Sequence, residues 1–251
     1  SLIDKSPLKR ERIEGTDLVF LRELTGGIYF GERGRKDEGK TAFDTCTYTR
    51  EEIQRLAKKG FELAMTRTKK LCCVDKANVL ESSRLWRETV QAMEKDYPEV
   101  EVSYEFVDAV AMRLVQWPNS YDVLITENLF GDILTDEASV ISGSMGLMPS
   151  ASIGSKISLY EPIHGSFPQA AGKDIANPLA TVLSAAMMFE MSFGLQKEGT
   201  LIRKVADQSL SEGIVTEDLV KGDAKAYKTS EVGDYLASNI EIYKSSPGEV
   251  S

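Results

Sequence analysis

Two aspartates four residues apart form the acidic pair in this sequence best suited to bind a metal. Asp132 and Asp136 close the segment Asn128-Leu-Phe-Gly-Asp-Ile-Leu-Thr-Asp136, which is predicted to be helical. Residues at this spacing share one helix face, about one turn apart. Two such carboxylates suit Mg²⁺ or Mn²⁺, hard ions that keep further positions for substrate and water. The alternative is a pair of solvated surface acids, which the apolar residues around them disfavour.

Two further candidates follow predicted strands. Lys76 comes two residues after the apolar run 71–74, and Asp108 follows the alternating segment 100–106. The carboxyl ends of parallel strands border the crevice of an open α/β sheet, where ligands bind. A partly desolvated lysine at such a place can act as a general base. The simpler alternatives are a lysine that marks the strand's exit to solvent and an aspartate that caps the next helix.

Arg22 and Tyr29 flank a predicted turn at Gly26-Gly27. Arginine is the preferred bidentate partner of a carboxylate. A tyrosine hydroxyl can deliver a proton when a nearby cation steadies the phenolate. Taken singly, the arginine also fits a structural ion pair and the tyrosine a turn aromatic.

A loop of small residues runs from His164 to Pro178. Its glycines permit close approach to a nucleotide, and it ends where Asn177-Pro178 predicts a helix start. It matches neither the dinucleotide-binding glycine fingerprint nor the P-loop, so a plain connecting loop is the alternative. His164 is the single histidine, which excludes mechanisms that need two.

Apolar patterning predicts an α/β fold with alternating strands and helices. Strands are expected at 17–21, 71–74, 100–106, 121–126 and 156–160, and helices after the capping box Thr49-Arg-Glu-Glu52, from Ser82 or Ser83, at 109–115, from a cap at Asn128 to about 141, and at 177–193, 198–212 and 230–244. The helix at 177–193 is apolar nearly all round and is expected to be buried. Residues 32–48 are expected to form an exposed arm or loop, and 143–150 a loop. A composition shift near Gly143 predicts two domains, 1–142 and 143–251.

Composition excludes several classes of protein. The chain has 251 residues, 42% apolar and 27% charged, with a net charge of −9, which argues against nonspecific binding to nucleic acid or to an anionic membrane. Its apolar runs fall short of the roughly 20 residues of a spanning helix. Three cysteines make no disulfide framework, which favours a reducing compartment.

Four motifs combine these candidates in one order and spacing: Arg22-Glu-Leu-Thr-Gly-Gly-Ile-Tyr-Phe-Gly31, Val74-Asp-Lys-Ala-Asn-Val-Leu80, Phe130-Gly-Asp-Ile-Leu-Thr-Asp136, and Glu161-Pro-Ile-His-Gly-Ser166 with Ala176-Asn-Pro178. The set resembles the 3-isopropylmalate dehydrogenases of the β-decarboxylating dehydrogenase family, whose other members act on isocitrate, homoisocitrate and tartrate. The Glu-Leu-Thr-Gly-Gly stretch distinguishes it from isocitrate dehydrogenases, which carry Asn-Thr-Glu or Asn-Ser-Glu after the arginine. The resemblance covers about residue 6 to the last helix.

The resemblance implies an open sheet with helices on both faces, distinct from the Rossmann fold. It implies oxidative decarboxylation of 3-isopropylmalate to 4-methyl-2-oxopentanoate in cytoplasmic leucine biosynthesis, with NAD and Mg²⁺ or Mn²⁺. It also implies roles for the candidates: Arg22 and Asp108 bind substrate, Tyr29 is the acid and Lys76 the base, Asp108, Asp132 and Asp136 hold the metal, and His164, Gly165, Ser166 and Asn177 line the adenosine site of NAD. Lys76 and Asp108 would serve the neighbouring subunit's site in a homodimer.

Two departures from the family pattern qualify these expectations. The family's N-terminal segment does not precede Ser1, so the chain is expected to hold the substrate and dimerisation domain and the trailing part of the cofactor domain. Gln169 stands where NAD users carry an aspartate, but no cation is present there for the 2′-phosphate of NADP, so NAD is expected. The alternatives are an enzyme for another 3-substituted malate, or a catalytically inactive fragment or dimerisation subunit.

Overall fold

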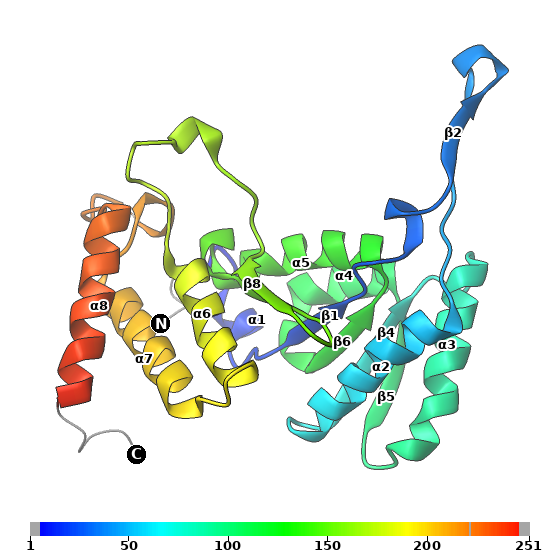
Figure 1. The fold of residues 1–251 in the computed structure, drawn as a ribbon, viewed down its shortest axis with the longest axis horizontal. Helices are drawn as coiled ribbons and strands as arrows, with labels where there is room; N and C mark the ends of the chain where they lie inside the picture. Colours follow the sequence, from blue (N-terminus) through cyan, green and yellow to red (C-terminus); the bar gives the residue numbers. More distant parts are fainter. Residues whose placement is uncertain (1–5, 221, 246–251) are drawn as a thin grey trace. The chain divides into compact units, whose positions relative to one another are not determined.

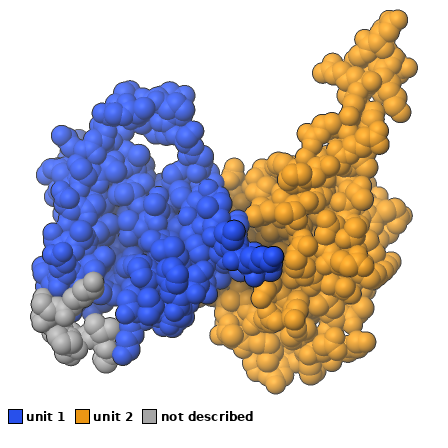
Figure 2. Space-filling model, viewed as in Figure 1, with its two compact units in different colours: residues 1–7, 139–251 blue, residues 8–138 orange. Residues whose placement is uncertain are grey.

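The computed structural model describes residues 6–220 and 222–245, which divide into two compact units. One unit comprises residues 8–138, and the other comprises 139–251 with 1–7 (Figure 2). Each is described by itself below. The predicted domain boundary at 142/143 stays a prediction.

A parallel sheet of four strands forms the centre of unit 8–138 (Figure 1). Its order is β1 (Val19–Arg22), β6 (Val123–Thr126), β4 (Lys70–Asp75) and β5 (Glu101–Phe106). Arg22 pairs with Thr126, and Thr126 with Val74, so the carboxyl ends of the strands meet at one edge. This edge therefore receives the residues that follow each strand.

Helices cover both faces of this sheet, which confirms the predicted fold class. Helices α2 (Arg50–Met65) and α3 (Glu81–Met93) pack on one face, and α4 (Val107–Gln116) and α5 (Asn128–Ser142) on the other. Within β4, Leu71 and Cys73 belong to the first core and Cys72 and Val74 to the second, because successive strand residues point to opposite faces.

The predicted capping box at the start of α2 is confirmed. The Thr49 hydroxyl accepts the Glu52 N–H, and the Glu52 carboxylate accepts the Thr49 N–H at 2.7 Å. Further along the same helix, Gly60 is buried against Ile125 of the sheet. The helix thus approaches the sheet at a point where only a hydrogen fits.

Residues 32–48, expected to be an exposed arm or loop, contain a hairpin. Strands β2 (Arg33–Lys36) and β3 (Thr41–Asp44) pair antiparallel, and Figure 1 shows them projecting from their unit. Most of their side chains are exposed. The strands were missed because polar residues on both faces give no apolar alternation.

The unit of residues 139–251 has an antiparallel pair, β7 (Pro149–Ile153) and β8 (Ser158–Pro162), and three long helices, α6 (Leu179–Met191), α7 (Gln196–Glu212) and α8 (Thr229–Ser245). The expectation of a plain loop at 143–150 is wrong, because β7 begins within it. The expected burial of α6 all round is also wrong. It packs on β7, β8 and α7, which leave Met191 56% exposed.

The remaining elements are short. They are α1 (Arg10–Ile13) and the 3-10 turns η2 (Gly27–Tyr29), η3 (Asp37–Gly39), η4 (Glu94–Asp96), η5 (Pro118–Ser120), η6 (Met145–Leu147), η7 (Pro168–Ala170) and η8 (Glu217–Leu219).

Two element bounds differ slightly from expectation. Helix α3 begins at Glu81 rather than at a serine, and β8 lies two residues later than expected. Among the described helices, none is long and apolar enough to cross a membrane.

The contact at Gly60 gives a stability prediction with a matched control. A Cβ there would lie 2.5 Å from Ile125 Cγ2, so Gly60→Ala should lower the free energy of unfolding by about 1–3 kcal/mol through overpacking. Gly233→Ala, in α8 with open space around it, should raise it by about 0.5–1 kcal/mol, as expected for a helix interior. Chemical denaturation would measure both. Equal effects of the two substitutions would contradict the contact.

Candidate active site

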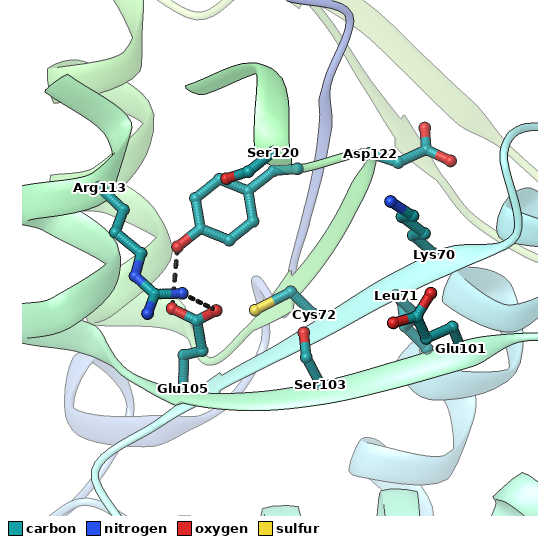
Figure 3. Close-up of a pocket in the computed structure, with 10 residues that line it drawn as sticks. Lys70, Leu71, Cys72, Glu101, Ser103, Glu105, Arg113, Ser120 and Asp122 are labelled. Carbon is teal, nitrogen blue, oxygen red and sulfur yellow. Dashed lines mark hydrogen bonds and ion pairs between the residues drawn. The ribbon is translucent and has the colours of Figure 1, made fainter. Parts of the chain in front are cut away.

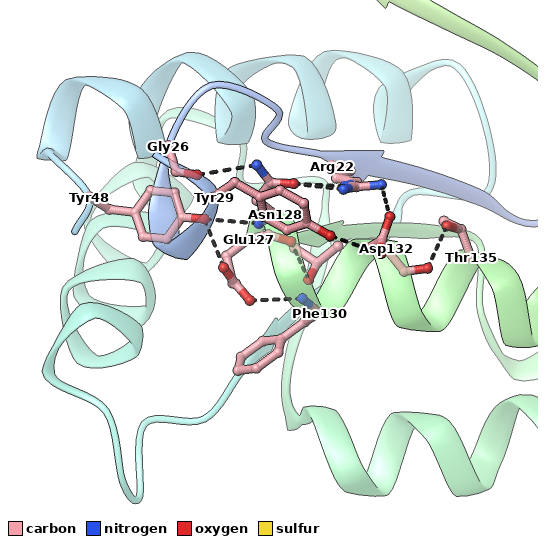
Figure 4. Close-up of polar contacts among 10 residues, drawn as sticks. Arg22, Gly26, Tyr29, Tyr48, Glu127, Asn128, Phe130, Asp132 and Thr135 are labelled. Atoms are coloured by element: carbon pink, nitrogen blue, oxygen red, sulfur yellow. Dashed lines mark hydrogen bonds and ion pairs between the residues drawn. The ribbon is translucent and has the colours of Figure 1, made fainter. Parts of the chain in front are cut away.

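Arg22 meets the first turns of α5 at the carboxyl edge of the sheet (Figure 4). Arg22 ends β1, and α5 begins two residues after β6, the strand beside β1. The guanidinium Nη1 donates to Asp132 Oδ1 at 2.7 Å. Gly131 makes this approach possible, because a Cβ there would lie 2.7 Å from Arg22 Cγ.

Asn128 holds the other side of the same guanidinium. Its Oδ1 accepts hydrogen bonds from Nε at 3.0 Å and from Nη2 at 2.7 Å. Its Nδ2 donates to the Gly26 carbonyl at 3.2 Å, so the amide is held from both ends. Asn128 is 2% exposed.

Tyr29 joins the cluster through Asp132. Its hydroxyl donates to Asp132 Oδ2 at 2.9 Å, and the Arg22 guanidinium carbon lies 5.6 Å from its ring centroid. The hydrogen bond to the carboxylate raises the pKa of Tyr29, against the opposing influence of Arg22. The phenol is therefore protonated near neutral pH, the form required of a proton donor. The structure brings together Arg22, Tyr29 and Asp132 of the predicted site residues.

A buried network around Glu127 fixes the start of α5. Glu127 Oε1 accepts the Phe130 N–H at 2.8 Å, so Glu127 caps the helix rather than the expected Asn128. Its Oε2 accepts the Tyr48 hydroxyl at 2.7 Å, and the Asn128 N–H donates to Tyr48 Oη at 2.9 Å. Burial raises the pKa of Tyr48 well above its usual range. Glu127 was not among the predicted site residues, although its place directly after a buried strand was the available signal.

Lys76 and Asp108 form a second group at the same sheet edge. Lys76 follows β4, Asp108 lies in the first turn of α4 after β5, and their Nζ and Oδ1 atoms are 2.5 Å apart. The hydrogen bond from the ammonium lowers the pKa of Asp108. The sequence suggested that Asp108 lies at the end of a strand. It lies instead in the first turn of α4, because β5 ends at Phe106.

Asp75 anchors the segment that carries Lys76. Its fully buried carboxylate accepts hydrogen bonds from Arg87 Nε at 2.8 Å and from Arg87 Nη2 at 3.1 Å, and also accepts the Ala77 N–H. The Arg87 guanidinium carbon lies within 5.5 Å of the ring centroids of Tyr104 and Phe106. Neither residue was predicted, because partners twelve residues apart on different elements leave no local pattern in the sequence.

The described residues contain no group of three or more His, Cys, Asp or Glu side chains arranged to hold a metal. The predicted ligands Asp108, Asp132 and Asp136 are therefore not gathered within one chain. Asp132 and Asp136 lie one turn apart on α5, whereas Asp108 pairs with Lys76. A metal site completed by a second subunit stays a prediction.

The predicted nucleotide residues lie in the other unit, between β8 and α6. Gly165 and Ser166 are exposed, and His164 Nδ1 lies 3.0 Å from the Gly165 carbonyl oxygen. Asn177 Oδ1 accepts the Leu179 N–H at 3.0 Å, and its Nδ2 donates to Asp218 Oδ2. The loop thus exposes two small residues and ends at an anchored helix start.

A pocket lies at the opposite, amino edge of the sheet, and none of the predicted site residues lines it (Figure 3). Glu105 there accepts hydrogen bonds from Arg113 at 2.8 Å and from the Tyr121 hydroxyl at 2.9 Å, and Asp122 accepts the Thr68 N–H at 2.8 Å. Burial raises the pKa of Cys72 to about 12, so its thiol is unreactive near neutral pH. The two carboxylates therefore serve structural pairing.

Comparison with known proteins matches the chain across both units. The isocitrate/isopropylmalate dehydrogenase family model matches residues 1–236. Curated 3-isopropylmalate dehydrogenases from Desulfitobacterium hafniense and Heyndrickxia coagulans are 52% and 53% identical, each over 96% of this chain. The chain spans 68% and 66% of their lengths. A crystal structure of isocitrate dehydrogenase from Methylococcus capsulatus superposes with a TM-score of 0.84 at 34% identity, over 90% of this chain and 70% of that one.

Glu23 holds the chain between Arg22 and Tyr29. It is 4% exposed, and its carboxylate accepts the Thr25 N–H and hydroxyl and an Arg55 N–H at 2.9 Å. Burial acts to raise the pKa of Glu23, but the hydrogen bonds from Thr25 and Arg55 outweigh it, so the net pKa is lowered.

This lowered pKa gives a pH-dependent stability prediction. The folded pKa lies below the unfolded value of about 4.3, so the contribution of Glu23 is present above that pH and is lost as pH falls through the folded pKa. Glu23→Gln should cost about 1–3 kcal/mol at pH 7 and progressively less below pH 4. Denaturant titrations across pH would measure this. The exposed Glu88→Gln, in the middle of α3, should change stability by under about 0.5 kcal/mol. A Glu23→Gln deficit that stays constant with pH would contradict the assignment.

Proposed function

Since the chain belongs to the isocitrate/isopropylmalate dehydrogenase family, we propose that it forms part of an NAD-dependent 3-isopropylmalate dehydrogenase. The proposed reaction oxidises the substrate hydroxyl and releases CO₂, giving 4-methyl-2-oxopentanoate. The observation that carries this proposal is the cluster of Arg22, Tyr29 and Asp132 at the sheet edge. It combines a carboxylate-binding cation, a protonated phenol and a metal-binding acid.

Substrate binding is assigned to the guanidinium of Arg22. Its side chain is 23% exposed, so the group reaches the surface while Asn128 and Asp132 hold its orientation. A guanidinium held in this way matches the planar geometry of a malate carboxylate.

The divalent metal is assigned to Asp132 and Asp136, with Asp108 from a second copy. Two carboxylates one turn apart are hard oxygen donors that suit Mg²⁺ or Mn²⁺ and leave positions for substrate. When bound, the metal supplies Lewis-acid stabilisation of the charge that develops as CO₂ leaves.

Proton transfers are assigned to Lys76 and Tyr29. As the neutral amine, Lys76 would take the proton of the substrate hydroxyl, and NAD⁺ would supply the acceptor for the hydride at C2. Loss of CO₂ leaves an enolate, and the Tyr29 hydroxyl would give its proton to the carbon that carried the carboxylate, which yields the ketone and a phenolate. The position of Tyr29 beside Asp132 and Arg22 supports this role.

NAD binding is assigned to His164, Gly165, Ser166 and Asn177. The exposed backbone of Gly165 and Ser166 supports this, because no Cβ at Gly165 obstructs a ligand. Gln169 and Ala170 offer no cation for a 2′-phosphate, which favours NAD over NADP.

A homodimer with shared sites is proposed from the order of the strands. Arg22 ends β1 and Asp108 follows β5, the two edge strands of the sheet. Three strand spacings of roughly 4.8 Å place those strand ends about 14 Å apart. That span, and the anchoring of the Arg22 guanidinium on Asn128 and Asp132, favour a site in which each substrate takes Lys76 and Asp108 from the second copy.

Turnover of the full-length gene product tests the proposed reaction. With Mg²⁺ or Mn²⁺ and NAD⁺ we expect NADH formation with 3-isopropylmalate, and much lower kcat/KM with isocitrate, tartrate or NADP⁺. Asp132→Asn should abolish the metal-dependent rate, because it removes one of the charges that bind the dication. A preference for isocitrate or tartrate would contradict the substrate assignment.

Subunit complementation tests the shared site. Lys76→Met and Tyr29→Phe should each be nearly inactive, with Lys76→Met reducing the chemical step by about 10²-fold or more. After mixing and reassociation in equal amounts, half the dimers are mixed, and each mixed dimer has one intact site. About a quarter of the parent activity should therefore return, assuming free exchange of a symmetric dimer.

The same experiment distinguishes sites within one subunit. If both residues served one subunit's site, every site in a mixed dimer would carry one lesion. No recovery, with exchange confirmed by a separate label, would contradict sharing while leaving the reaction assignment intact.

A further inference from the structure

We propose that Asn128 is a positioning residue that sets the orientation of the Arg22 guanidinium for the substrate carboxylate. The inference rests on the proposed function, in which Arg22 binds substrate. It assigns the substrate affinity of the site partly to a buried side chain that does not itself reach the substrate.

The hydrogen bonds of Arg22 leave its guanidinium little freedom to rotate. Asn128 Oδ1 accepts from Nε and Nη2, and Asp132 Oδ1 accepts from Nη1, so bonds to two different residues define the plane. Arginine has five N–H donors and three are used here, so one on Nη1 and one on Nη2 remain for a ligand. A carboxylate that binds them meets a guanidinium already held in place.

The amide of Asn128 is itself held in one orientation. Nδ2 donates to the Gly26 carbonyl, so the oxygen must face Arg22. The backbone N–H of Asn128 donates to Tyr48, which fixes the start of the helix independently of the side chain. The side chain is therefore committed to Arg22 and the Gly26 turn.

The chemistry of an amide suits this position. An amide oxygen accepts two N–H bonds without adding a negative charge, whereas a carboxylate there would compensate the cation. Asp132 already contributes one negative charge to the guanidinium. A neutral second acceptor thus orients Arg22 while preserving its attraction for an anionic substrate.

A double-mutant cycle in the full-length enzyme tests this role. Asn128→Ser removes the amide oxygen that accepts from Arg22 and keeps a residue tolerated at a helix start. It should raise KM for 3-isopropylmalate about 10- to 100-fold, the range for losing hydrogen bonds to a charged group. KM for NAD⁺ should stay within twofold. In an Arg22→Lys background, which keeps the charge but lacks the fork, Asn128→Ser should add less than about threefold, because coupled residues are not additive.

The control is Asn119→Ser, an exposed asparagine of the same unit whose Nδ2 donates to the Glu14 carbonyl. It should leave both KM values within twofold. An Asn128→Ser effect of equal size in both backgrounds would overturn the proposal, as would a folded Asn128→Ser enzyme with the parent's KM. Asn128→Ala replaces Asn128→Ser if the serine variant is not recovered folded.

The proposed reaction and the proposed role of Asn128 are contradicted by different results. A parent enzyme without activity on 3-isopropylmalate would contradict the reaction, not the role of Asn128. The same cycle is then measured by calorimetry of binding of malate, the unit common to substituted malates. Coupling between Arg22 and Asn128 in malate affinity would support the proposal, and its absence would overturn it.

Discussion

The hydrogen bonds between the Arg22 guanidinium and the first turns of α5 are the interaction on which the candidate site depends. They join the end of β1 to Asn128 and Asp132 across the neighbouring strand end. Through Asp132 they also reach Tyr29, and through Asn128 they reach the Gly26 turn. One cation thus connects two segments of the chain, the stretch from Arg22 to Tyr29 and the first turns of α5.

Parallel pairing of the strands brings Arg22 close to the start of α5, and a few buried groups stabilise this arrangement. Register between β1 and β6 sets Arg22 beside the strand end from which α5 starts. The approach then depends on Gly131, since a side chain there would displace the arginine stem. Glu127 and Tyr48 hold the helix start by buried hydrogen bonds, which are strong in a low-dielectric interior.

Sequence patterns predicted the elements better than their partnerships. Alternation at 100–106 and the capping box at Thr49 identified a strand and a helix start, because both signals are local. The polar hairpin at 33–44 carries no such signal, and the exposure of α6 depends on which elements cover it. Arg22, Tyr29 and Asp132 were predicted as site residues, whereas Glu127, Asn128 and Asp75 act through partners more than ten residues away, which spacing does not reveal.

The order of the strands also limits how a complete site can form. Arg22 and the Lys76–Asp108 pair stand at the same carboxyl edge, but β6 separates β1 from β4 and the pair continues onto β5. The Arg22 guanidinium is held by Asn128 and Asp132, and the Lys76 ammonium by Asp108, so within one copy each is bound to its own neighbours. In the proposed dimer a twofold axis would satisfy this constraint, because each copy would contribute Lys76 and Asp108 to the site of the other. Each copy then carries two half-sites, and a symmetric pair has two complete sites.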